Sequence, residues 1–258
     1  MPDNLQSMFR LDGKTALVSG ASKGIGEAMA RGLAEFGAKV VVSSRKQEAV
    51  DAVAEELRTD GLEATAIAAN MGSIDDIQSL LDKTVEVYGG LDIIVNNAAA
   101  NPVFGPVQNT DERAFDKIID VNLKGPFELC KRAHPIMQRR GGGSIINISS
   151  IGGLKPESGI GIYSVSKAAI ISLTQAMAQD WGADGIRVNA ICPGLIKTKF
   201  SEALWQDQQI HDQFVNRIPL GRIGEPGDIA GLAVYLASDA SAYCSGGFYM
   251  VDGGYSVN

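Results

Sequence analysis

Short runs of β-branched residues alternate with amphipathic stretches along this 258-residue chain. The runs predict seven strands, at Thr15–Ser19, Lys39–Ser43, Ala64–Ala68, Ile93–Asn96, Ser144–Ile148, Arg187–Ile191 and Phe248–Val251. The intervening stretches predict six helices, at Ile25–Phe36, Gln47–Thr59, Ile74–Tyr88, Asp111–Arg139, Tyr163–Trp181 and Asp228–Ala237. Such alternation implies right-handed crossovers and an α/β fold with a doubly wound parallel sheet. Because no linker or repeat interrupts it, residues 1–258 are predicted to form a single domain.

Charge and composition exclude several classes of function. A net charge of −7 argues against nucleic acid or an anionic membrane as a partner. No apolar run is long enough to cross a membrane, and the first residues lack the pattern of a secretory signal, so the cytoplasm is expected. The three cysteines, Cys130, Cys192 and Cys244, are far apart in the sequence, and so are the two histidines, His134 and His211. This spacing supports neither a disulfide framework, nor a metal site, nor a histidine-dependent triad.

A glycine-rich turn follows the first predicted strand and leads into a helix. It reads Gly20-Ala21-Ser22-Lys23-Gly24-Ile25-Gly26. Glycines allow positive φ and close approach of the backbone, and the N–H groups at the start of the next helix attract phosphate. At the first strand of an alternating βα chain, the turn predicts a dinucleotide site that includes Gly20, Ser22, Lys23, Gly24, Ile25 and Gly26.

The end of the second predicted strand bears on the choice of dinucleotide. An acidic residue at this place binds the ribose 2′-hydroxyl of NAD, but the chain has Ser44 and Arg45 there. Arginine suits a 2′-phosphate, and Lys23 is expected nearby, so NADP(H) is preferred and NAD(H) remains possible. The alternative is that Arg45 and Lys23 are ordinary surface charges.

Tyr163 and Lys167 are four residues apart, so on a helix they share a face. A buried ammonium close to the phenol would lower its pKa from about 10 and give a general acid/base usable near neutral pH. The alternative is a core tyrosine beside a solvated lysine. Ser150, next to Ser149 at the end of the fifth predicted strand, precedes Tyr163 and is a candidate third member of the site.

Asn122 lies four residues before Pro126 in a predicted helix. Proline has no N–H, so the Asn122 carbonyl loses its helical partner and the helix should kink there. The freed carbonyl could hold a water, and the alternative is a kink with no further role.

The segment at about 195–225 follows the carboxyl end of the sixth predicted strand and mixes apolar with polar residues. It is either an ordinary pair of surface helices or a short helical lid over a substrate pocket.

Taken together, these motifs identify the chain as similar to the short-chain dehydrogenase/reductase family over essentially its whole length. The matching motifs are Gly20-x-x-x-Gly24-x-Gly26, Asn96-Asn97-Ala98, Asn122, Ser150, Tyr163-x-x-x-Lys167, Pro193-Gly194 and Asp252-Gly253-Gly254. Residues 41–46, 101–105 and 193–198 most resemble the NADPH-dependent carbonyl and retinal reductases of that family. The resemblance implies a Rossmann-type, seven-stranded parallel sheet in the order 3-2-1-4-5-6-7.

The resemblance also implies roles for individual residues. Tyr163 is the general acid/base, Ser150 stabilises the substrate oxygen, Lys167 lowers the tyrosine pKa and holds the nicotinamide ribose, and Asn122 serves a proton relay. Further cofactor contacts are implied for Asn70, Met71, Asn97, Ala98, Pro193, Gly194, Ile196 and Thr198. Two departures are Ala99, where the family has glycine, and Asn70, where it has an acidic residue.

An NADPH-dependent carbonyl reductase for apolar substrates is the leading hypothesis. Its pocket is expected to contain Val103, Phe104, Ser150, Leu154, Tyr163, Gly194, Phe200, Leu204 and Trp205. The alternatives are an NAD-dependent alcohol dehydrogenase, a nucleotide-sensing scaffold without chemistry, and a 3-oxoacyl-acyl-carrier-protein reductase. The last would dock its carrier on Lys131, Arg132, Arg139 and Arg140. The resemblance further implies a homotetramer that uses the predicted helices at 111–139 and 163–181 and the chain end.

Overall fold

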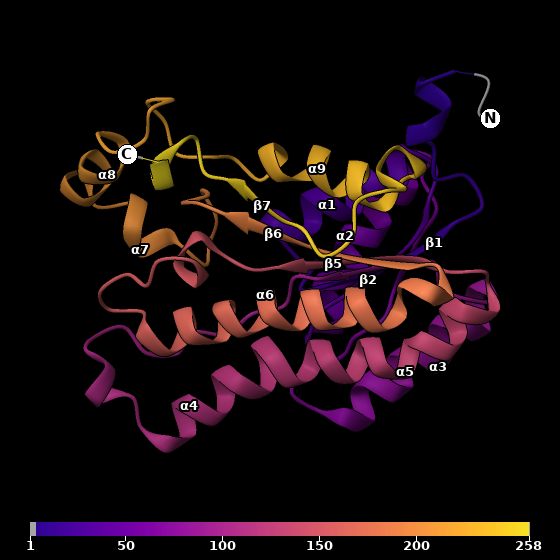
Figure 1. Ribbon diagram of the computed structural model, residues 1–258, viewed down its shortest axis with the longest axis horizontal. Helices are drawn as coiled ribbons and strands as arrows, with labels where there is room; N and C mark the ends of the chain where they lie inside the picture. The colour runs from indigo at the N-terminus through magenta and orange to yellow at the C-terminus, as the bar shows by residue number, and fades with distance from the viewer. Residues whose placement is uncertain (1–3, 258) are drawn as a thin grey trace.

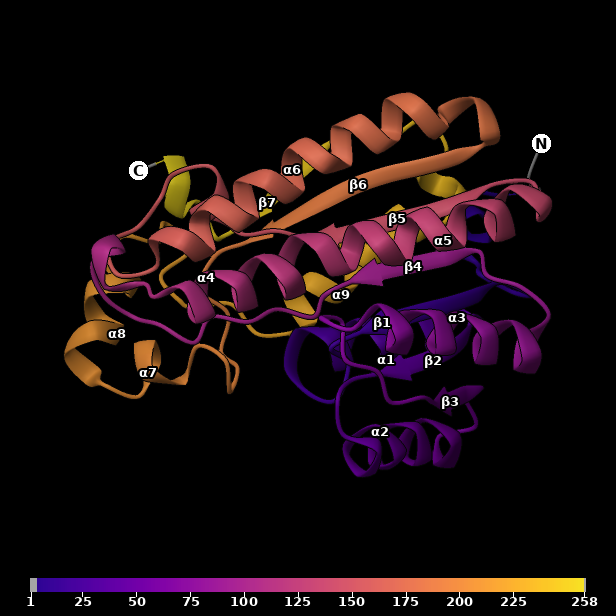
Figure 2. The same ribbon diagram turned by 90° about the horizontal axis from the view of Figure 1, so that it is seen from below.

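Seven parallel strands form one sheet in the order β3-β2-β1-β4-β5-β6-β7, which confirms the predicted fold class. The computed structural model describes residues 4–257, so the ends of the predicted 1–258 domain, residues 1–3 and 258, lie outside the described residues. The strands are β1 (Thr15–Ser19), β2 (Lys39–Ser43), β3 (Ala64–Ala66), β4 (Ile93–Asn96), β5 (Gly143–Ile148), β6 (Ile186–Pro193) and β7 (Phe248–Val251). Figure 2 shows this order across the sheet.

Helices cover both faces of the sheet. They are α1 (Gly24–Glu35), α2 (Gln47–Thr59), α3 (Ile74–Tyr88), α4 (Glu112–Ile119), α5 (Gly125–Arg139), α6 (Gly161–Trp181), α7 (Glu202–Trp205), α8 (Gln208–Val215) and α9 (Gly227–Ala237). In Figure 1, α1, α2 and α9 lie above the sheet, and α3 to α6 lie below it. Two buried apolar clusters fill the two interfaces, and the strands contribute alternate residues to them: Val40 and Val42 to one, Val41 to the other.

Strand ends differ slightly from the predictions. The predicted strand Ala64–Ala68 ends at Ala66, although the N–H groups of Ile67 and Ala69 still donate to the carbonyls of Val42 and Ser44. In contrast, β6 extends beyond the predicted Arg187–Ile191 as far as Pro193, which is paired with Val251 of β7.

The predicted helix Asp111–Arg139 is not continuous. A π-helical turn at Asp120–Lys124 separates α4 from α5, and the N–H of Gly125 donates to the carbonyl of Asp120, five residues back. Pro126 has no N–H to continue the regular bonding, so the chain widens by one residue here. The predicted irregularity at Asn122 is therefore confirmed, and it takes the form of a widened turn.

Strand β1 lies between β2 and β4, so the sheet changes direction of winding at the β1–β4 boundary. The carboxyl ends of strands on the two sides of such a boundary diverge and leave a crevice for a ligand. Helices α7 and α8 and the C-terminus lie beyond this same end of the sheet, away from the N-terminus (Figures 1 and 2). Among residues 4–257, no helix is both long enough and apolar enough to cross a membrane.

Candidate active site

The glycine turn packs directly against the end of β4. Gly20 and Gly24 have φ of 66° and 63°, a backbone region that other residues avoid. A Cβ on Gly26 would lie 2.4 Å from both the Asn97 Nδ2 and the Gly20 carbonyl oxygen, so only glycine fits at this first turn of α1. The Asn97 amide donates to the carbonyls of Ser19 (3.1 Å) and Gly20 (2.9 Å). Asn97 therefore holds the turn open at the predicted phosphate site.

Ser19 was not singled out by the sequence, yet it joins the two halves of this crevice. Its hydroxyl accepts hydrogen bonds from the N–H groups of Asn97 (3.1 Å) and Ala98 (3.2 Å) and donates to the carbonyl of Val95. The signal available in the sequence was a polar residue at the last position of a buried strand, immediately before the glycine turn. Ser19 therefore fixes the position of the backbone at Asn97 and Ala98, just after the end of β4.

The end of β2 presents cationic rather than acidic groups. Ser44 is half-buried, whereas Arg45 and Lys23 are exposed. The backbone links these segments, since the N–H of Ala21 donates to the Ser43 carbonyl at 2.9 Å. The Ser43 hydroxyl is buried and has no hydrogen-bond partner within residues 4–257. The cationic side chains that the sequence places after β2 and in the glycine turn are thus accessible to a ligand.

Asn70 and Met71 lie at the carboxyl end of the β3 segment. The Asn70 side chain accepts from the N–H of Gly72, and the Asn70 N–H donates to Asp76, whose pKa is lowered mainly by that bond. The carbonyl of Met71 lies so close to Gly125 that a Cβ on this glycine would be 2.1 Å from it. Met71 is thereby placed against the widened turn between α4 and α5.

The chain after β6 returns to the glycine turn. A Cβ on Gly24 would be 3.1 Å from Cγ2 of Thr198, so Thr198 lies over the predicted phosphate site. Ile196 is buried, and Gly194 packs closely on Asp252, where a Cβ would be 2.8 Å from the aspartate Cβ. Pro193, Gly194, Ile196 and Thr198 thus form one edge of the crevice opened by Gly20 and Asn97.

Tyr163 and Lys167 lie on the first turns of α6, facing the end of β5. Lys167 is only 3% exposed, its Nζ donates to the Ile148 carbonyl at 2.7 Å, and the same Nζ lies 5.5 Å from the centre of the Tyr163 ring. Ser150 follows β5 and hydrogen-bonds Tyr163. Ser149 is buried and donates to the Lys167 carbonyl, away from the phenol. The arrangement brings Ser150, Tyr163 and Lys167 together as predicted.

The expected depression of the tyrosine pKa is wrong for this structure. Burial raises the pKa of Tyr163 to about 12, and the hydrogen bond with Ser150 lowers it by less. Burial also lowers the pKa of Lys167 to about 8, which the neighbouring Cys192 only partly offsets. The ammonium donates to the Ile148 carbonyl and lies 5.5 Å from the ring centre, and desolvation remains the largest influence on the pKa of the phenol. Tyr163 is therefore a protonated phenol at neutral pH.

Asn122 connects the widened turn to the neighbouring loop and to α6. Its amide nitrogen donates to the Ala100 carbonyl (3.0 Å) and to the Ser166 hydroxyl (3.0 Å), while its oxygen accepts from the Ala100 N–H (2.7 Å). Ser166 in turn donates to the carbonyl of Tyr163 at 2.6 Å. The side chain of Asn122 is thus fully used, and Ser166 is a second polar residue that the sequence did not reveal.

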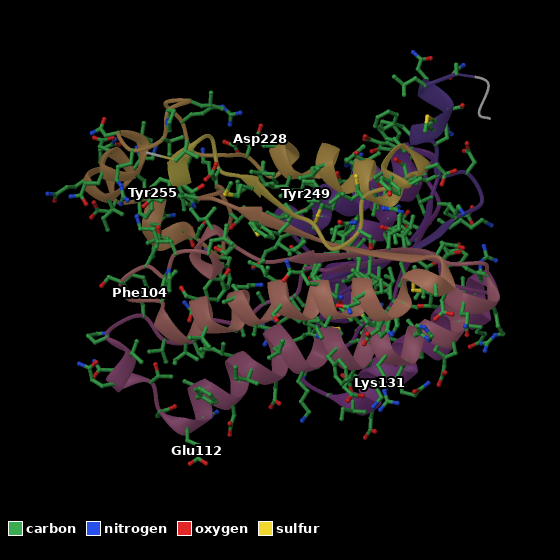
Figure 3. All side chains as sticks on the ribbon, viewed as in Figure 1. Phe104, Glu112, Lys131, Asp228, Tyr249 and Tyr255 are labelled. Atoms are coloured by element: carbon green, nitrogen blue, oxygen red, sulfur yellow. The ribbon has the colours of Figure 1, made fainter. Side chains whose placement is uncertain are left out.

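Aromatic side chains gather near the phenol. The ring of Phe200 lies 6.1 Å from that of Tyr163, and Phe104 and Leu154 are exposed at the same end of the molecule. Figure 3 shows Phe104 at the end where α7 and α8 lie. The indole N–H of Trp205 donates to the carbonyl of Thr198 at 3.0 Å.

The 195–225 segment folds as α7 and α8, next to a cavity of about 360 Å³. Its lining residues are Lys197, Trp205, Gln208, His211, Val215, Gly221, Arg222, Ile223 and Glu225. Within residues 4–257, no three His, Cys, Asp or Glu side chains converge as a metal site would require.

Three comparisons place these features in a wider context. A family model described as enoyl-(acyl carrier protein) reductase matches residues 20–256. Dehydrogenase/reductase SDR family member 4 from Homo sapiens is 42% identical over 244 residues, which are 95% of this chain and 88% of the relative. The crystal structure of gluconate 5-dehydrogenase from Burkholderia cenocepacia J2315 in complex with NADP and tartrate has a TM-score of 0.95 and 33% identity, covering 99% of this chain and 100% of its own. A short-chain type dehydrogenase/reductase from Mycobacterium marinum has a TM-score of 0.93 and 37% identity, with 99% and 100% coverage.

Proposed function

Because the chain belongs to the short-chain dehydrogenase/reductase family of oxidoreductases, we propose that it transfers a hydride between NADP(H) and a ketone, an aldehyde or a secondary alcohol. Tyr163 is the proposed general acid/base. The observation that carries the proposal is the meeting of Ser150, Tyr163 and Lys167 beside the crevice formed by Gly20 and Asn97.

In the direction of reduction, Tyr163 gives its proton to the carbonyl oxygen of the substrate. Its raised pKa favours this direction, because the phenol carries the proton at neutral pH. Ser150 donates a hydrogen bond to the same oxygen as negative charge develops on it. Lys167 stabilises the tyrosinate that remains, and the water-bound carbonyl of Asn122 is the proposed route by which the proton is restored. When bound, the nicotinamide supplies the hydride.

The proposed cofactor is NADP(H). Gly20, Ser22, Gly24, Ile25 and Gly26 would hold the pyrophosphate, and Lys23, Ser44 and Arg45 would hold the 2′-phosphate. Asn70, Met71, Asn97 and Ala98 would contact the adenosine half, and Tyr163, Lys167, Pro193, Gly194, Ile196 and Thr198 the nicotinamide half. The complex of the Burkholderia cenocepacia relative with NADP supports this choice. The test compares kcat/KM for NADPH with that for NADH, and a clear preference for NADH contradicts the proposal.

The proposed substrates are apolar carbonyl compounds. Support comes from Phe104, Leu154 and Phe200, whose side chains are 70%, 39% and 58% exposed at the end of the molecule where Tyr163 lies. The 195–225 segment is the proposed lid. The decisive assay is NADPH consumption with a panel of diketones, retinal, steroid ketones, sugar-acid ketones and acetoacetyl thioester. Turnover confined to the sugar acids would contradict the apolar assignment.

The acyl-carrier alternative receives little support from the charges on α5. Lys131 and Arg132 share Glu128, and Arg140 pairs with Asp92, so two carboxylates offset part of the positive charge predicted to dock an acidic carrier. Turnover of the acetoacetyl thioester without turnover of free ketones would restore this alternative.

The proposed assembly is a cytoplasmic homotetramer. Apolar side chains exposed on the candidate interface elements support it, namely Phe115 on α4, Phe127 on α5, Val165 on α6, and Phe248 and Met250 on β7. Size-exclusion chromatography with light scattering tests it, and a monomeric mass would contradict it.

A further inference from the structure

Both the hydroxyl and the ring of Tyr255, three residues from the end of the chain, contact other side chains. Its hydroxyl donates to the carboxylate of Glu157 and accepts from the guanidinium of Arg217. The Arg217 guanidinium carbon lies 4.5 Å from the centre of the Tyr255 ring. The ring also stacks on Phe214, with 5.9 Å between ring centres and 25° between the planes. Such a combination of stacking and charge-assisted hydrogen bonds holds a side chain in one orientation.

The partners of Tyr255 come from two different segments around the candidate active site. Glu157 lies in the connection between Ser150 and α6, which carries Tyr163 at its third position. Phe214 belongs to α8 of the proposed lid, and Arg217 follows two residues after that helix ends. Tyr255 is therefore the bridge between the lid and the segment that joins two of the proposed catalytic residues.

The same connection is also held by the segment at residues 104–107. The N–H of Gly105 donates to the Gly159 carbonyl at 2.9 Å, in an isolated bridge between the two segments. A Cβ on Gly159 would be 3.0 Å from the ring of Phe104, and a Cβ on Gly161 would be 2.4 Å from Cγ2 of Val107. The 104–107 segment is thus packed closely against Gly159 and Gly161, and Glu157 of the same connection interacts with Tyr255.

We propose that Tyr255 is a positioning residue that ties α8 to the segment between Ser150 and Tyr163 and so fixes the mouth of the substrate site. The inference rests on the proposed function. Figure 3 shows Tyr255 and Phe104 at the same end of the molecule, with Lys131 toward the other end. With the tie in place, α8 is held over the site. Without it, the lid loses this contact with the Ser150–Tyr163 connection, and substrate binding weakens more than chemistry does.

The pKa of Tyr255 agrees with this geometry. Burial is the largest cause of its rise above 10, and Glu157 adds to it. The hydroxyl therefore keeps its proton and remains a donor to Glu157 throughout the neutral range, so the tie does not depend on the titration of the phenol.

The test compares three variants, Tyr255→Phe, Glu157→Gln and their combination, with the wild type. Loss of a hydrogen bond to a half-buried charge should raise KM for the carbonyl substrate about three- to tenfold. The kcat and the KM for NADPH should stay within about twofold, since neither Tyr255 nor Glu157 belongs to the chemistry or the cofactor site. If the two residues act as one unit, the combined variant should be no worse than either single one. Tyr243→Phe, at a fully exposed tyrosine, is the matched control.

Hydrogen exchange in α8, measured without substrate, separates this inference from the proposed function. Faster exchange in α8 of Tyr255→Phe, with exchange in α3 unchanged, supports the tie even if the wild type reduces no carbonyl compound. Equal exchange and equal KM in an enzyme that reduces ketones overturn the tie and leave the proposed function intact. A fall of kcat with KM for the carbonyl substrate unchanged, or additive effects in the combined variant, also overturns the tie.

Discussion

The Nζ of Lys167 donates a 2.7 Å hydrogen bond to the carbonyl of Ile148, two residues before Ser150. The same ammonium lies 5.5 Å from the centre of the Tyr163 ring, and burial lowers the pKa of Lys167 from 10.5 to about 8. The lysine therefore carries its charge at neutral pH and loses it in moderately alkaline solution, whereas a lysine in the unfolded chain stays charged.

A pH dependence of stability follows from Lys167. Between about pH 8 and 10.5 the unfolded chain binds more protons than the folded one, so this residue makes stability rise with pH over that window. Below about pH 8 Lys167 is charged in both the folded and the unfolded state, so the stability gained at higher pH is absent and no longer changes with pH. The free energy of unfolding of the wild type minus that of Lys167→Met, from urea titrations, should therefore increase across the window. A constant difference would show that the ammonium is not desolvated.

Replacing Tyr163 by phenylalanine removes the proposed general acid and leaves the ring. We expect kcat/KM for carbonyl reduction to fall at least about 100-fold, because general acid catalysis contributes factors of that size. NADPH binding, measured by fluorescence titration, should persist. The control is Tyr249→Phe, at a half-buried tyrosine on β7. Undiminished hydride transfer in the Tyr163 variant would end the mechanistic proposal.

Two glycines in helices offer a matched pair. In Gly26→Ala, the new Cβ meets the Gly20 carbonyl oxygen at 2.4 Å, so the glycine turn must shift, with a loss of about 1–3 kcal/mol and of NADPH affinity. In Gly231→Ala on α9, the Cβ meets nothing within 4 Å, and the helix should gain about 0.5–1 kcal/mol. Thermal unfolding and NADPH titration measure both. Equal stability of the two variants would contradict the tight contact.

Arg45 is the proposed determinant of cofactor choice. Arg45→Ala should lower kcat/KM for NADPH at least about tenfold, because a charge-assisted hydrogen bond to phosphate is lost. The value for NADH should change little. Arg58→Ala serves as the control, because Arg58 pairs with Glu55 on α2. If both cofactors lost activity equally, Arg45 would have a role other than recognition of the 2′-phosphate.

Asn122→Ala removes three hydrogen bonds that join the widened turn to Ala100 and Ser166. We expect a loss of about 1–3 kcal/mol in stability from the unsatisfied partners, together with a lower kcat at saturating substrate. Ser166→Ala, which loses the hydroxyl but keeps Asn122 bonded to Ala100, should retain more activity. Unchanged turnover in Asn122→Ala would show that these side-chain bonds are not needed to hold the Asn122 carbonyl in place for the proposed relay.

The strands, the glycine turn and the grouping of Tyr163 with Lys167 were predictable because they depend on residues close in sequence. The pKa of Tyr163 was not predictable in this way. A four-residue spacing shows that Lys167 is near, but it does not show the depth of burial, which has the largest effect on that pKa. Proline chemistry predicted the irregularity at Asn122, but the widened form also depends on how closely the Met71 carbonyl approaches Gly125. The role of Ser19 was hidden, because its partners are 78 and 79 residues away.

That long separation between Ser19 and its partners has a consequence for the order of events during synthesis. A nascent chain that ends before residue 97 already contains the whole glycine turn. It lacks the Asn97 amide and the two N–H groups that donate to the Ser19 hydroxyl. The turn is then unsupported on its β4 side. The ribosome must therefore deliver more than a third of the polypeptide before the first half of the molecule gains the capacity to retain a dinucleotide.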